Sequence, residues 1–393
     1  MSIRVYAHEL PGPGEMLRLI RTGEANSRSE LARATGLSRT AVSARLAGLF
    51  DAGLVIETGD SASTGGRPPT RLSFNPEAGA VFAAAIGRSR IQVGLCDLAG
   101  QLLALRTEDQ DVDAGPQVVL PRVRAMFKEL RTQADRPDIQ IRGIGVSIPG
   151  VVDLKRQMAL SAPELVGWDG EPVAPPLQKG FDVPVFLERD CNAMALAERD
   201  GLLREYRDLI LVKVSTGIGA GIVLDHRLHR GFGGVAGEIG HTRVARPEGR
   251  MCRCGSMDCL EAYASGWALV KAMRDRGRRV SHVRDAVARA LDGDGVATSL
   301  IRESGRQVGE ILASVINLLN PQALVIGGDM AAAFEPLLAG IRESVYGGAV
   351  TLASRDLRVL PTTNGELTGV VGAANLVLTQ VLSAGAVDTL VRG

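Results

Sequence analysis

The sequence has no excess of either charge, no long hydrophobic run and few cysteines. Lys and Arg number 45 and Asp and Glu number 44, so the formal net charge of +1 gives no overall sign of a nucleic-acid or membrane partner. No apolar run approaches the roughly 18 residues that span a bilayer, and no signal peptide is recognisable at the N-terminus. The five cysteines do not suggest a disulfide framework, because their number is odd. We therefore expect a cytoplasmic protein with reduced thiols and no membrane partner.

The length and composition indicate a soluble protein of several domains. With 393 residues the chain is longer than one ordinary domain, and two or three domains are expected. Hydrophobic residues make up 45 %, which is enough for substantial cores, and the charged fraction of 23 % is typical of soluble proteins. Any signal for a charged partner must therefore be local.

The first eighty residues carry the pattern of a helix-turn-helix. Ser27 and Glu30 form a capping-box pattern, which predicts a helix over 28–35. Ser38 can cap a further helix over 39–51, after a short turn that contains a glycine. Two short helices joined by such a turn are typical of DNA-binding proteins.

The local charge of this segment supports DNA binding. Residues 18–50 contain six arginines and two glutamates, and the difference is +4. The N-terminal part of the second helix of this motif reaches base edges in the major groove. Five residues there are candidates for contacts with bases or phosphates: Ser38, Arg39, Thr40, Ser43 and Arg45. A small helical bundle with a solvated basic face is the alternative.

Two short strand patterns follow these helices and predict a winged form of the motif. Residues 54–58 and 70–74 have the composition of the two strands of a hairpin. The segment 63–69 between them has glycines and prolines around Arg67, which would hold this arginine extended. An extended arginine can enter a narrow A·T-rich minor groove. We therefore expect residues 1–78 to form a winged helix-turn-helix domain that binds double-stranded DNA.

From residue 79 onward, β-rich runs alternate with helical stretches, which indicates an α/β fold. Strands, some with a following turn, are expected at 81–86, 91–95, 143–150, 183–187, 209–214 and 323–328, and a closing helix at 372–383. Polar or glycine-rich segments directly follow several of these strands, where open α/β sheets bind ligands. One such segment contains Asp190, just before a helix expected at 193–200, and another is the glycine-rich turn 215–221. For Asp190, a simple helix N-cap is the alternative to a ligand contact.

One histidine and three cysteines lie close together in the sequence: His241, Cys252, Cys254 and Cys259. This set is a complete tetrahedral shell for zinc, and a closed shell of this type is usually structural. Glu238 and Glu261 flank it. We expect zinc to fix a loop that presents Glu238, His241 and Glu261 to a polyol. A few buried thiols beside a solvated face are the alternative, but scattered core cysteines rarely cluster so tightly.

Residues 79–393 resemble the ROK family of sugar kinases and sugar-sensing repressors, and the N-terminal segment resembles its repressor branch. The resemblance rests on the block Glu-x-Gly-His…Cys-x-Cys-Gly-x-x-x-Cys-x-Glu at 238–261, and on matches at 188–192, 215–221 and 327–328. It implies an actin-like (ribonuclease H-like) two-lobed domain of the sugar-kinase type. Lobe 1 would comprise about 79–190 with a C-terminal helix at about 372–393, and lobe 2 about 191–371.

The resemblance also implies roles for single residues. In this family the aspartate at the position of Asp190 contacts the sugar, and in kinases it is the base that accepts the proton of the attacking hydroxyl. The residues at Glu238, His241 and Glu261 hold sugar hydroxyls, and the histidine also joins the three cysteines around zinc. Arg189 stands where the family usually has an asparagine that helps to hold the sugar. It would close the pocket, favour an acidic or phosphorylated ligand, or point outward.

The phosphate loop departs from the kinase pattern. Kinases of the family have Asp-x-Gly-Gly-Thr-Lys, whereas this chain has Ala85-Ile-Gly-Arg88-Ser-Arg90. The aspartate associated with magnesium and phosphate is replaced by Ala85, and the second glycine by Arg88. Phosphoryl transfer depends on such groups, so the domain is expected to sense a sugar without phosphorylating it. Asp258 replaces a family glycine in the zinc loop, and zinc binding should survive because Asp tolerates left-handed backbone.

We therefore expect a sequence-specific DNA-binding regulator, a repressor of carbohydrate-metabolism genes whose operator binding responds to a sugar or sugar derivative. It would act as a homodimer or dimer of dimers on a palindromic operator, with structural zinc as its cofactor. One alternative is an ATP-dependent sugar kinase with an appended DNA-binding domain. Another is a constitutive DNA-binding protein with a defunct sugar pocket.

Overall fold

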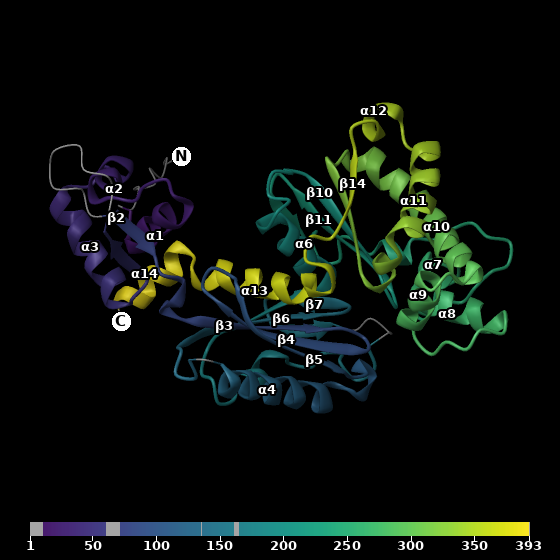
Figure 1. Cartoon of the computed structure of the whole chain (residues 1–393), viewed down its shortest axis with the longest axis horizontal. Coiled ribbons are helices and arrows are strands. Elements are labelled where there is room, and N and C mark those ends of the chain that lie inside the picture. The colour runs from purple at the N-terminus through teal and green to yellow at the C-terminus, as the bar shows by residue number, and fades with distance from the viewer. Residues whose placement is uncertain (1–10, 60–70, 135, 161–164, 393) are drawn as a thin grey trace, which may run out of the picture.

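The computed structural model describes residues 11–59, 71–134, 136–160 and 165–392. Figure 1 shows a small N-terminal domain beside two larger α/β lobes, and the C-terminal helices lead from one lobe to the N-terminal domain. Among the described residues, no single helix is long and apolar enough to cross a membrane. One pair, 365–381 with 384–392, meets that test jointly and is bent by 57° at its break.

The N-terminal domain contains three helices and a two-stranded antiparallel sheet, as predicted for a winged helix-turn-helix. The elements are α1 (Pro13–Thr22), α2 (Arg28–Thr35), α3 (Arg39–Asp51), β1 (Val55–Thr58) and β2 (Arg71–Phe74). Helices α2 and α3 begin where predicted, because the Oγ atoms of Ser27 and Ser38 accept hydrogen bonds from amides three residues further on. The predicted wing tip with Arg67 lies outside the described residues.

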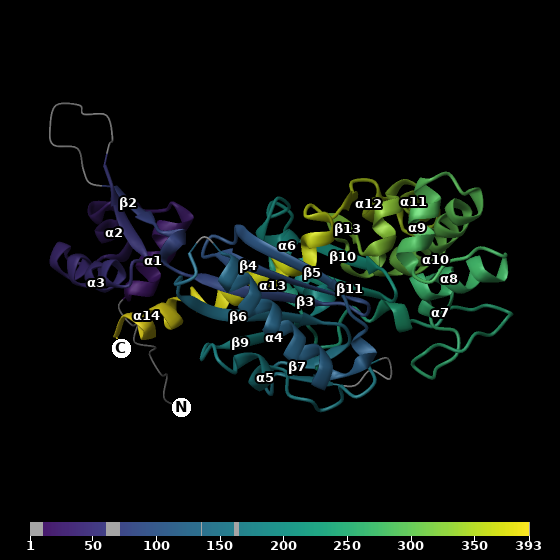
Figure 2. The same cartoon turned by 60° about the horizontal axis from the view of Figure 1, so that its bottom comes forward.

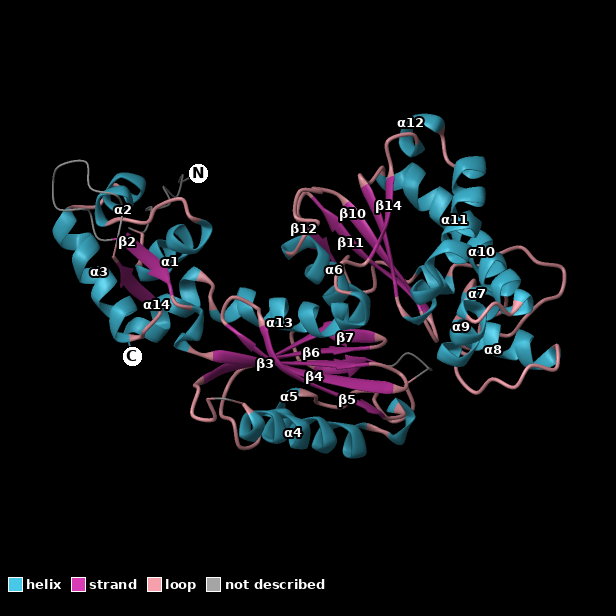
Figure 3. Cartoon of the chain, in the orientation of Figure 1, coloured by secondary structure: helices cyan, strands magenta, loops and turns pink. Residues whose placement is uncertain are grey.

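The first lobe is built on a mixed sheet with the strand order β5-β4-β3-β6-β9. The strands are β3 (Ala80–Ile86), β4 (Arg90–Asp97), β5 (Leu102–Asp109), β6 (Ile141–Ile148) and β9 (Val185–Arg189). Helices α4 (Pro116–Gln133) and α13 (Thr368–Val381) cover opposite faces of this sheet (Figures 1 and 3). The first five residues of β3 are therefore all buried and apolar, which is typical of a strand covered on both faces.

The second lobe has a sheet with the order β12-β11-β10-β13-β14. Its strands are β10 (Leu209–Val214), β11 (Ile218–Leu224), β12 (Arg227–His229), β13 (Ala323–Gly327) and β14 (Arg358–Pro361). Ile210 and Val212 belong to the core shared with α8 (Gly266–Asp275), α9 (Val283–Leu291), α10 (Gly295–Leu319) and α11 (Phe334–Gly348). Leu209 and Leu211 alternate with them and pack with Met194 of α6 (Asp190–Asp200) in a separate cluster.

Helix α6 joins the lobes, since it directly follows β9 of the first lobe and packs against β10 and β11 of the second as well as against α13. It begins at Asp190, three residues earlier than predicted, and its N-cap is Arg189. The alternative of Asp190 as the N-cap is therefore wrong.

The remaining elements are short: β7 (Val151–Asp153), β8 (Met158–Leu160), α5 (Ala174–Gln178), α7 (Glu261–Ala264), α12 (Thr351–Ser354), and the 3-10 turns η1 (Pro76–Ala78), η2 (Val112–Ala114), η3 (Ile239–His241), η4 (Asp329–Ala333) and η5 (Gly365–Leu367).

The C-terminal segment differs from the single helix expected at about 372–393. It forms two helices, α13 and α14 (Ala384–Arg392), and the second packs mainly against α1 of the N-terminal domain (Figures 1 and 2). Helix α13 ends at Val381, and the turn that follows allows the apolar Val387 of α14 to be buried in a core with side chains of α1.

Candidate functional site

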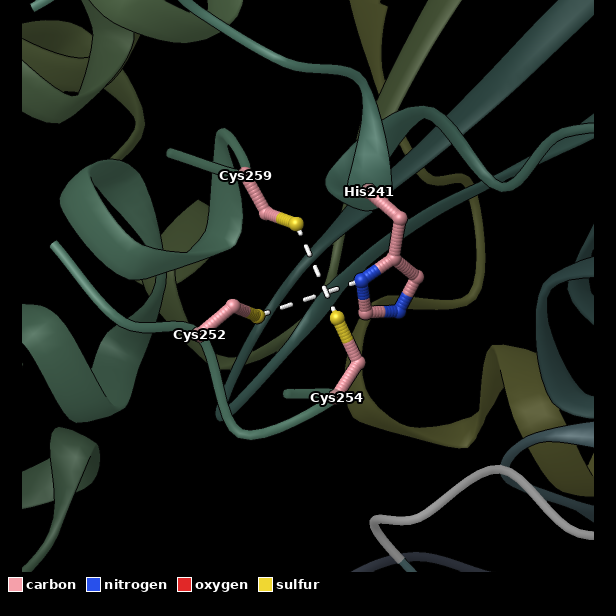
Figure 4. Close-up of side chains that lie close together, drawn as sticks. All are labelled: His241, Cys252, Cys254 and Cys259. Atoms are coloured by element: carbon pink, nitrogen blue, oxygen red, sulfur yellow. Dashed lines mark hydrogen bonds between the residues drawn. The ribbon is translucent and has the colours of Figure 1, made fainter. Parts of the chain in front are cut away.

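The predicted metal ligands lie together between η3 and α7, and Figure 4 shows Nδ1 of His241 facing the three sulfurs. One ligand atom from each of His241, Cys252, Cys254 and Cys259 lies within 4.8 Å of the others. The Sγ atoms of Cys254 and Cys259 are 3.6 Å apart, and Sγ of Cys252 is 3.9 Å from Nδ1 of His241. Tetrahedral Zn–S bonds of about 2.3 Å put two sulfurs about 3.8 Å apart. These residues can therefore hold a metal ion, and three thiols with one imidazole are donors that suit zinc.

Asp258, which replaces a family glycine, stabilises this loop. Its φ of 62° lies in the left-handed region that Asp tolerates. Its Oδ1 atom accepts hydrogen bonds from the hydroxyl of Tyr263 at 2.7 Å and from the amide of Arg250 at 2.9 Å. The hydrogen bond from Tyr263, followed by that from Arg250, lowers the pKa of the Asp258 carboxyl below its ordinary value. The two bonds tie together both sides of the cysteine-containing turn.

A cavity of about 520 Å³ lies beside this loop and between the two lobes, and its size is ordinary for a small-molecule site. Every residue predicted to bind the sugar lines it: Arg189, Asp190, Glu238, His241 and Glu261. Arg189 is the last residue of β9, and Asp190 is the first residue of α6. Glu238 directly precedes η3, and His241 is the last residue of η3. Glu261 is the first residue of α7. The fold thus brings together side chains from four elements.

Arg189 points inward and forms part of the cavity wall. Its side chain is only 3 % exposed, and its Nη1 atom lies 3.1 Å from Oε1 of Glu238. Nη1 also donates to the carbonyl of Ala236 at 2.9 Å, and Nη2 donates to the carbonyl of Ala220 at 3.2 Å. Of the orientations that the sequence leaves open, the outward one is wrong. The guanidinium holds Glu238 in place, and its charge is balanced by that carboxylate.

Asp190 forms an ion pair with Lys213 of β10. Nζ of Lys213 lies 2.5 Å from Oδ2 of Asp190, and the two side chains are 21 % and 14 % exposed. Burial alone would raise the pKa of the Asp190 carboxyl, but attraction to Lys213 and to Arg189 outweighs it and holds that pKa below its ordinary value. Oδ2 of Asp190 is therefore already engaged by an ammonium group of the protein.

Glu261 and His241 reach the cavity from the two ends of the metal-binding segment. Oε2 of Glu261 accepts a hydrogen bond from the amide of Ile218 at 3.1 Å, and Oε1 accepts one from Nε1 of Trp267 at 3.4 Å. Nε2 of His241 lies 3.8 Å from Oε2 of Glu238. With Nδ1 bound to a metal, the neutral imidazole carries its proton on Nε2, on the side of Glu238. The site thus combines carboxylate acceptors with an imidazole donor, which suits hydroxyl groups.

The loop at the position of the kinase phosphate loop bridges the two lobes. Oγ of Ser89 lies 2.8 Å from Nε2 of His282, the N-cap of α9. Nη2 of Arg284 on α9 lies 2.8 Å from Oδ1 of Asp109 at the end of β5. Ala85 lines the same side of the cavity and offers no carboxylate to a magnesium ion. Contacts between the lobes thus replace the groups that a phosphate loop needs.

A carboxylate of the segment after β13 lies against the glycine-rich turn that follows β10. Oγ of Ser215 in the turn after β10 donates a short hydrogen bond to Oδ2 of Asp329. Asp329 lines the cavity beside this turn. On the wall formed by lobe 1, Nη2 of Arg88 lies 3.1 Å from Oδ2 of Asp113, so this guanidinium is paired with an acid of its own lobe.

The residues predicted to contact DNA gather at the N-terminal end of α3. Arg39, Thr40 and Ser43 are exposed there, and Arg45 is half-buried. The Oγ atom of Ser38 accepts a hydrogen bond from an amide of the first turn at 3.2 Å, so this residue caps the helix. Nη1 of Arg45 donates to a carbonyl one turn earlier at 3.4 Å. The exposed end of α3 therefore offers hydroxyl and guanidinium groups to a ligand.

Two residues of the site, Lys213 and Asp329, were not predicted from the sequence. The available signal for Lys213 was its place in the otherwise apolar run 209–214, because a charge in a buried strand needs a partner. Asp329 follows the glycine pair that ends β13, and nothing near it in the sequence indicates its contact with Ser215.

Comparisons with known proteins agree with this architecture. The ROK family model matches residues 81–380. The xylose repressor of Bacillus spizizenii is 29 % identical over 368 residues, which are 93 % of this chain and 94 % of that protein. A solved ROK family transcriptional regulator, described as a homolog of the E. coli MLC protein, matches with a TM-score of 0.81 and 28 % identity over 97 % of this chain and 98 % of that one.

A solved ROK family glucokinase from Streptomyces griseus, in complex with glucose and AMPPNP, is 30 % identical with a TM-score of 0.66. This match covers 76 % of this chain and 99 % of the glucokinase, whereas the matches to the two regulators cover nearly the whole chain. The predicted two-lobed, sugar-kinase-like fold behind a winged helix-turn-helix is thereby confirmed, and the chain belongs to the ROK family.

Proposed function

We propose that this protein is a DNA-binding transcriptional repressor whose affinity for its operator changes when a sugar binds. One observation carries the proposal: a winged helix-turn-helix and sugar-kinase-like lobes form one chain that is similar to a xylose repressor over 93 % of its length. Arg39, Thr40 and Ser43 at the start of α3 contact base edges in the major groove, and Ser38, Arg45 and Arg67 contribute contacts to the DNA. Two α3 helices in a homodimer read the two halves of a palindromic operator.

The ligand is a neutral monosaccharide, a pentose or hexose such as xylose or glucose. Asp190, Glu238, His241 and Glu261 hold its hydroxyl groups, and Arg189 orients Glu238. The charges of Arg189 and Lys213 support a neutral ligand, because each is paired with a carboxylate of the protein.

The metal is zinc, and its role is structural. His241 and the three cysteines supply a full set of four ligands, so no position is open for a substrate or an activated water. When bound, the ion fixes the loop between η3 and α7. Side chains of the protein then bind the sugar: Glu238 and His241 on one side of the loop and Glu261 on the other face the cavity.

Titration of a DNA duplex from the region upstream of the gene tests the proposal. Fluorescence anisotropy with and without D-xylose or D-glucose is expected to show that one of the sugars changes the Kd for the duplex by about 5–150-fold, the usual range of coupling between two sites. Binding no tighter than to a shuffled duplex would refute the repressor function.

An ATP-dependent sugar kinase is the second candidate, because the chain is similar to a glucokinase over three quarters of its length. Ala85 and the bridging Ser89 oppose it. An ADP-release assay with ATP, magnesium and either sugar separates the two functions. We expect no sugar-dependent release, whereas release that disappears in Asp190→Asn would establish the kinase.

A further inference from the structure

We propose that the C-terminal helix α14 transmits the state of the sugar pocket to the DNA-binding domain. The inference rests on the proposed function and names its regulatory element. Helix α14 follows α13 after a bend of 57° and departs from the lobe on which α13 lies. Figures 1 and 2 both show it against the N-terminal domain, in yellow beside the purple helices. The last helix of the chain therefore connects the first domain with the pocket-bearing lobes.

A hydrogen bond joins α14 to the beginning of α1. Oδ1 of Asp388 accepts it from the amide of Gly14 at 2.7 Å. Amides in the first turn of a helix lack partners within the helix, and the N-cap of α1 is Gly12, which has no side chain to supply one. Asp388 thus caps α1 from a distant part of the chain, and its negative charge suits the helix N-terminus. Gly14 permits the approach, because a Cβ atom there would overlap the carbonyl oxygen of Ala384.

Helix α14 also contacts α3, the helix proposed to enter the major groove. Gly48 of α3 lies so close to Val391 that a Cβ atom on Gly48 would overlap Cγ1 of Val391. Val387 of α14 is fully buried in one apolar core with side chains of α1, α3, β3 and α13, among them Leu17 and Val377. Close-packed interiors are barely compressible, so a displacement of α13 is passed to α1 and α3 through this core.

The other end of this path reaches the pocket through α6. Asp190, which lines the cavity, is the first residue of α6. Gly372 of α13 lies so close to α6 that a Cβ atom there would overlap the carbonyl oxygen of Ala193. Nδ2 of Asn375 on α13 donates to the carbonyl of Leu196 on α6 at 3.4 Å. A sugar that repositions Asp190 therefore acts in turn on α6, α13 and α14, and α14 biases the DNA-binding domain between two positions.

The covalent link between the domains offers a competing path. It runs through η1, and Arg142 of β6 donates hydrogen bonds from Nη2 to the carbonyls of Ala78 at 3.1 Å and Ala52 at 3.5 Å. These contacts also connect lobe 1 with the N-terminal domain. Arg142→Ala removes them without changing α14, so mutation can separate the two paths.

Anisotropy titrations of the full-length chain with the upstream duplex, with and without D-xylose or D-glucose, test the inference. Asp388→Ala removes the acceptor of the Gly14 amide, Asp388→Asn retains an acceptor, and Thr389→Ala changes the exposed neighbouring position as the matched control. We expect Asp388→Ala to retain duplex binding and sugar binding, while the effect of sugar on the duplex Kd falls to less than about twofold. Asp388→Asn and Thr389→Ala should retain the full effect. The effect of the duplex on the sugar Kd must fall by the same factor in Asp388→Ala, because coupling is reciprocal.

A second variant tests α14 independently of Asp388. The methyl group added by Gly48→Ala displaces Val391, so the effect of sugar on the duplex Kd should fall, and adding Val391→Ala should restore it. The role of α14 is refuted if Asp388→Ala and Gly48→Ala both retain the full effect of sugar on the duplex Kd. It is also refuted if Arg142→Ala is the only variant that loses this effect. A wild-type chain that does not bind the duplex, or whose binding ignores both sugars, refutes instead the proposed function on which the inference rests.

Discussion

Replacement of Lys213 by methionine tests whether the pair with Asp190 stabilises the pocket. The two charged atoms lie 2.5 Å apart, and both side chains are largely buried. Lys213→Met retains much of the aliphatic volume and leaves the Asp190 carboxylate buried without its main partner. Removing one partner of a buried ion pair costs about 3–5 kcal/mol, because the other charge is left without compensation.

The expected loss is large enough to measure in a thermal melt. An unfolding entropy of about 2.1 cal/mol/K per residue, summed over the roughly 315 residues of the two lobes, converts this cost into a decrease in Tm of roughly 5–8 °C. The matched control is Lys271→Met. Lys271 pairs with Asp275 at 2.7 Å, but the side chains are 68 % and 59 % exposed, so the expected cost is below about 1 kcal/mol.

Differential scanning calorimetry of the two variants and of the double variant Lys213→Met/Asp190→Asn is the assay. The double variant should regain most of the lost stability, because it contains neither buried charge. A Lys213→Met variant that melts as high as Lys271→Met would show that the pair does not stabilise the fold, and the reasoning from burial would be refuted.

The pH dependence provides an independent check. In the wild type the lowered pKa of Asp190 adds stability that is present above the ordinary Asp pKa of about 3.9 and is lost as pH falls through the folded-state pKa. In Lys213→Met, burial without the ammonium raises the pKa of Asp190, so that variant loses stability as pH rises. The gap in Tm between wild type and variant should therefore be widest at neutral pH and narrow on acidification.

Three further predictions concern the metal, a buried acid and the DNA contact. Wild-type protein should contain about one zinc ion per chain by mass spectrometry, and Cys254→Ser should lose the ion and sugar binding while it still binds the duplex. Equal zinc contents would contradict the assigned ligands. Burial raises the pKa of Glu198, whose carboxylate accepts hydrogen bonds from Thr363, and stability is lost as pH rises through that pKa. Glu198→Gln should therefore raise Tm at pH 8 and have little effect below about pH 4, and a lower Tm at pH 8 would contradict this. Arg39→Ala should weaken duplex binding by about 1–3 kcal/mol, whereas Arg355→Ala, an exposed change in lobe 2, should not; equal anisotropy titrations would exclude Arg39 from the interface.

The features that the sequence by itself determined depend on residues that are neighbours along the chain. Ser27 and Ser38 cap α2 and α3 through amides three residues away, and Gly36 ends α2 in the left-handed conformation, so both helices have the predicted bounds. The four metal ligands lie within one short segment, and their spacing alone predicted that they meet. The replaced phosphate loop was likewise visible, because Ala85 and Arg88 occupy positions that a motif defines.

Only the tertiary structure decided which distant groups meet. Arg189 and Asp190 are adjacent in sequence, yet one pairs with Glu238 and the other with Lys213. Ser89 contacts His282 across the cleft, a contact that no local pattern encodes. The course of the last helix was decided in the same way. Burial of Val387 and capping by Asp388 depend on where α1 lies, and the position of α1 results from the packing of whole helices and sheets into a common core, not from the propensity of any single segment.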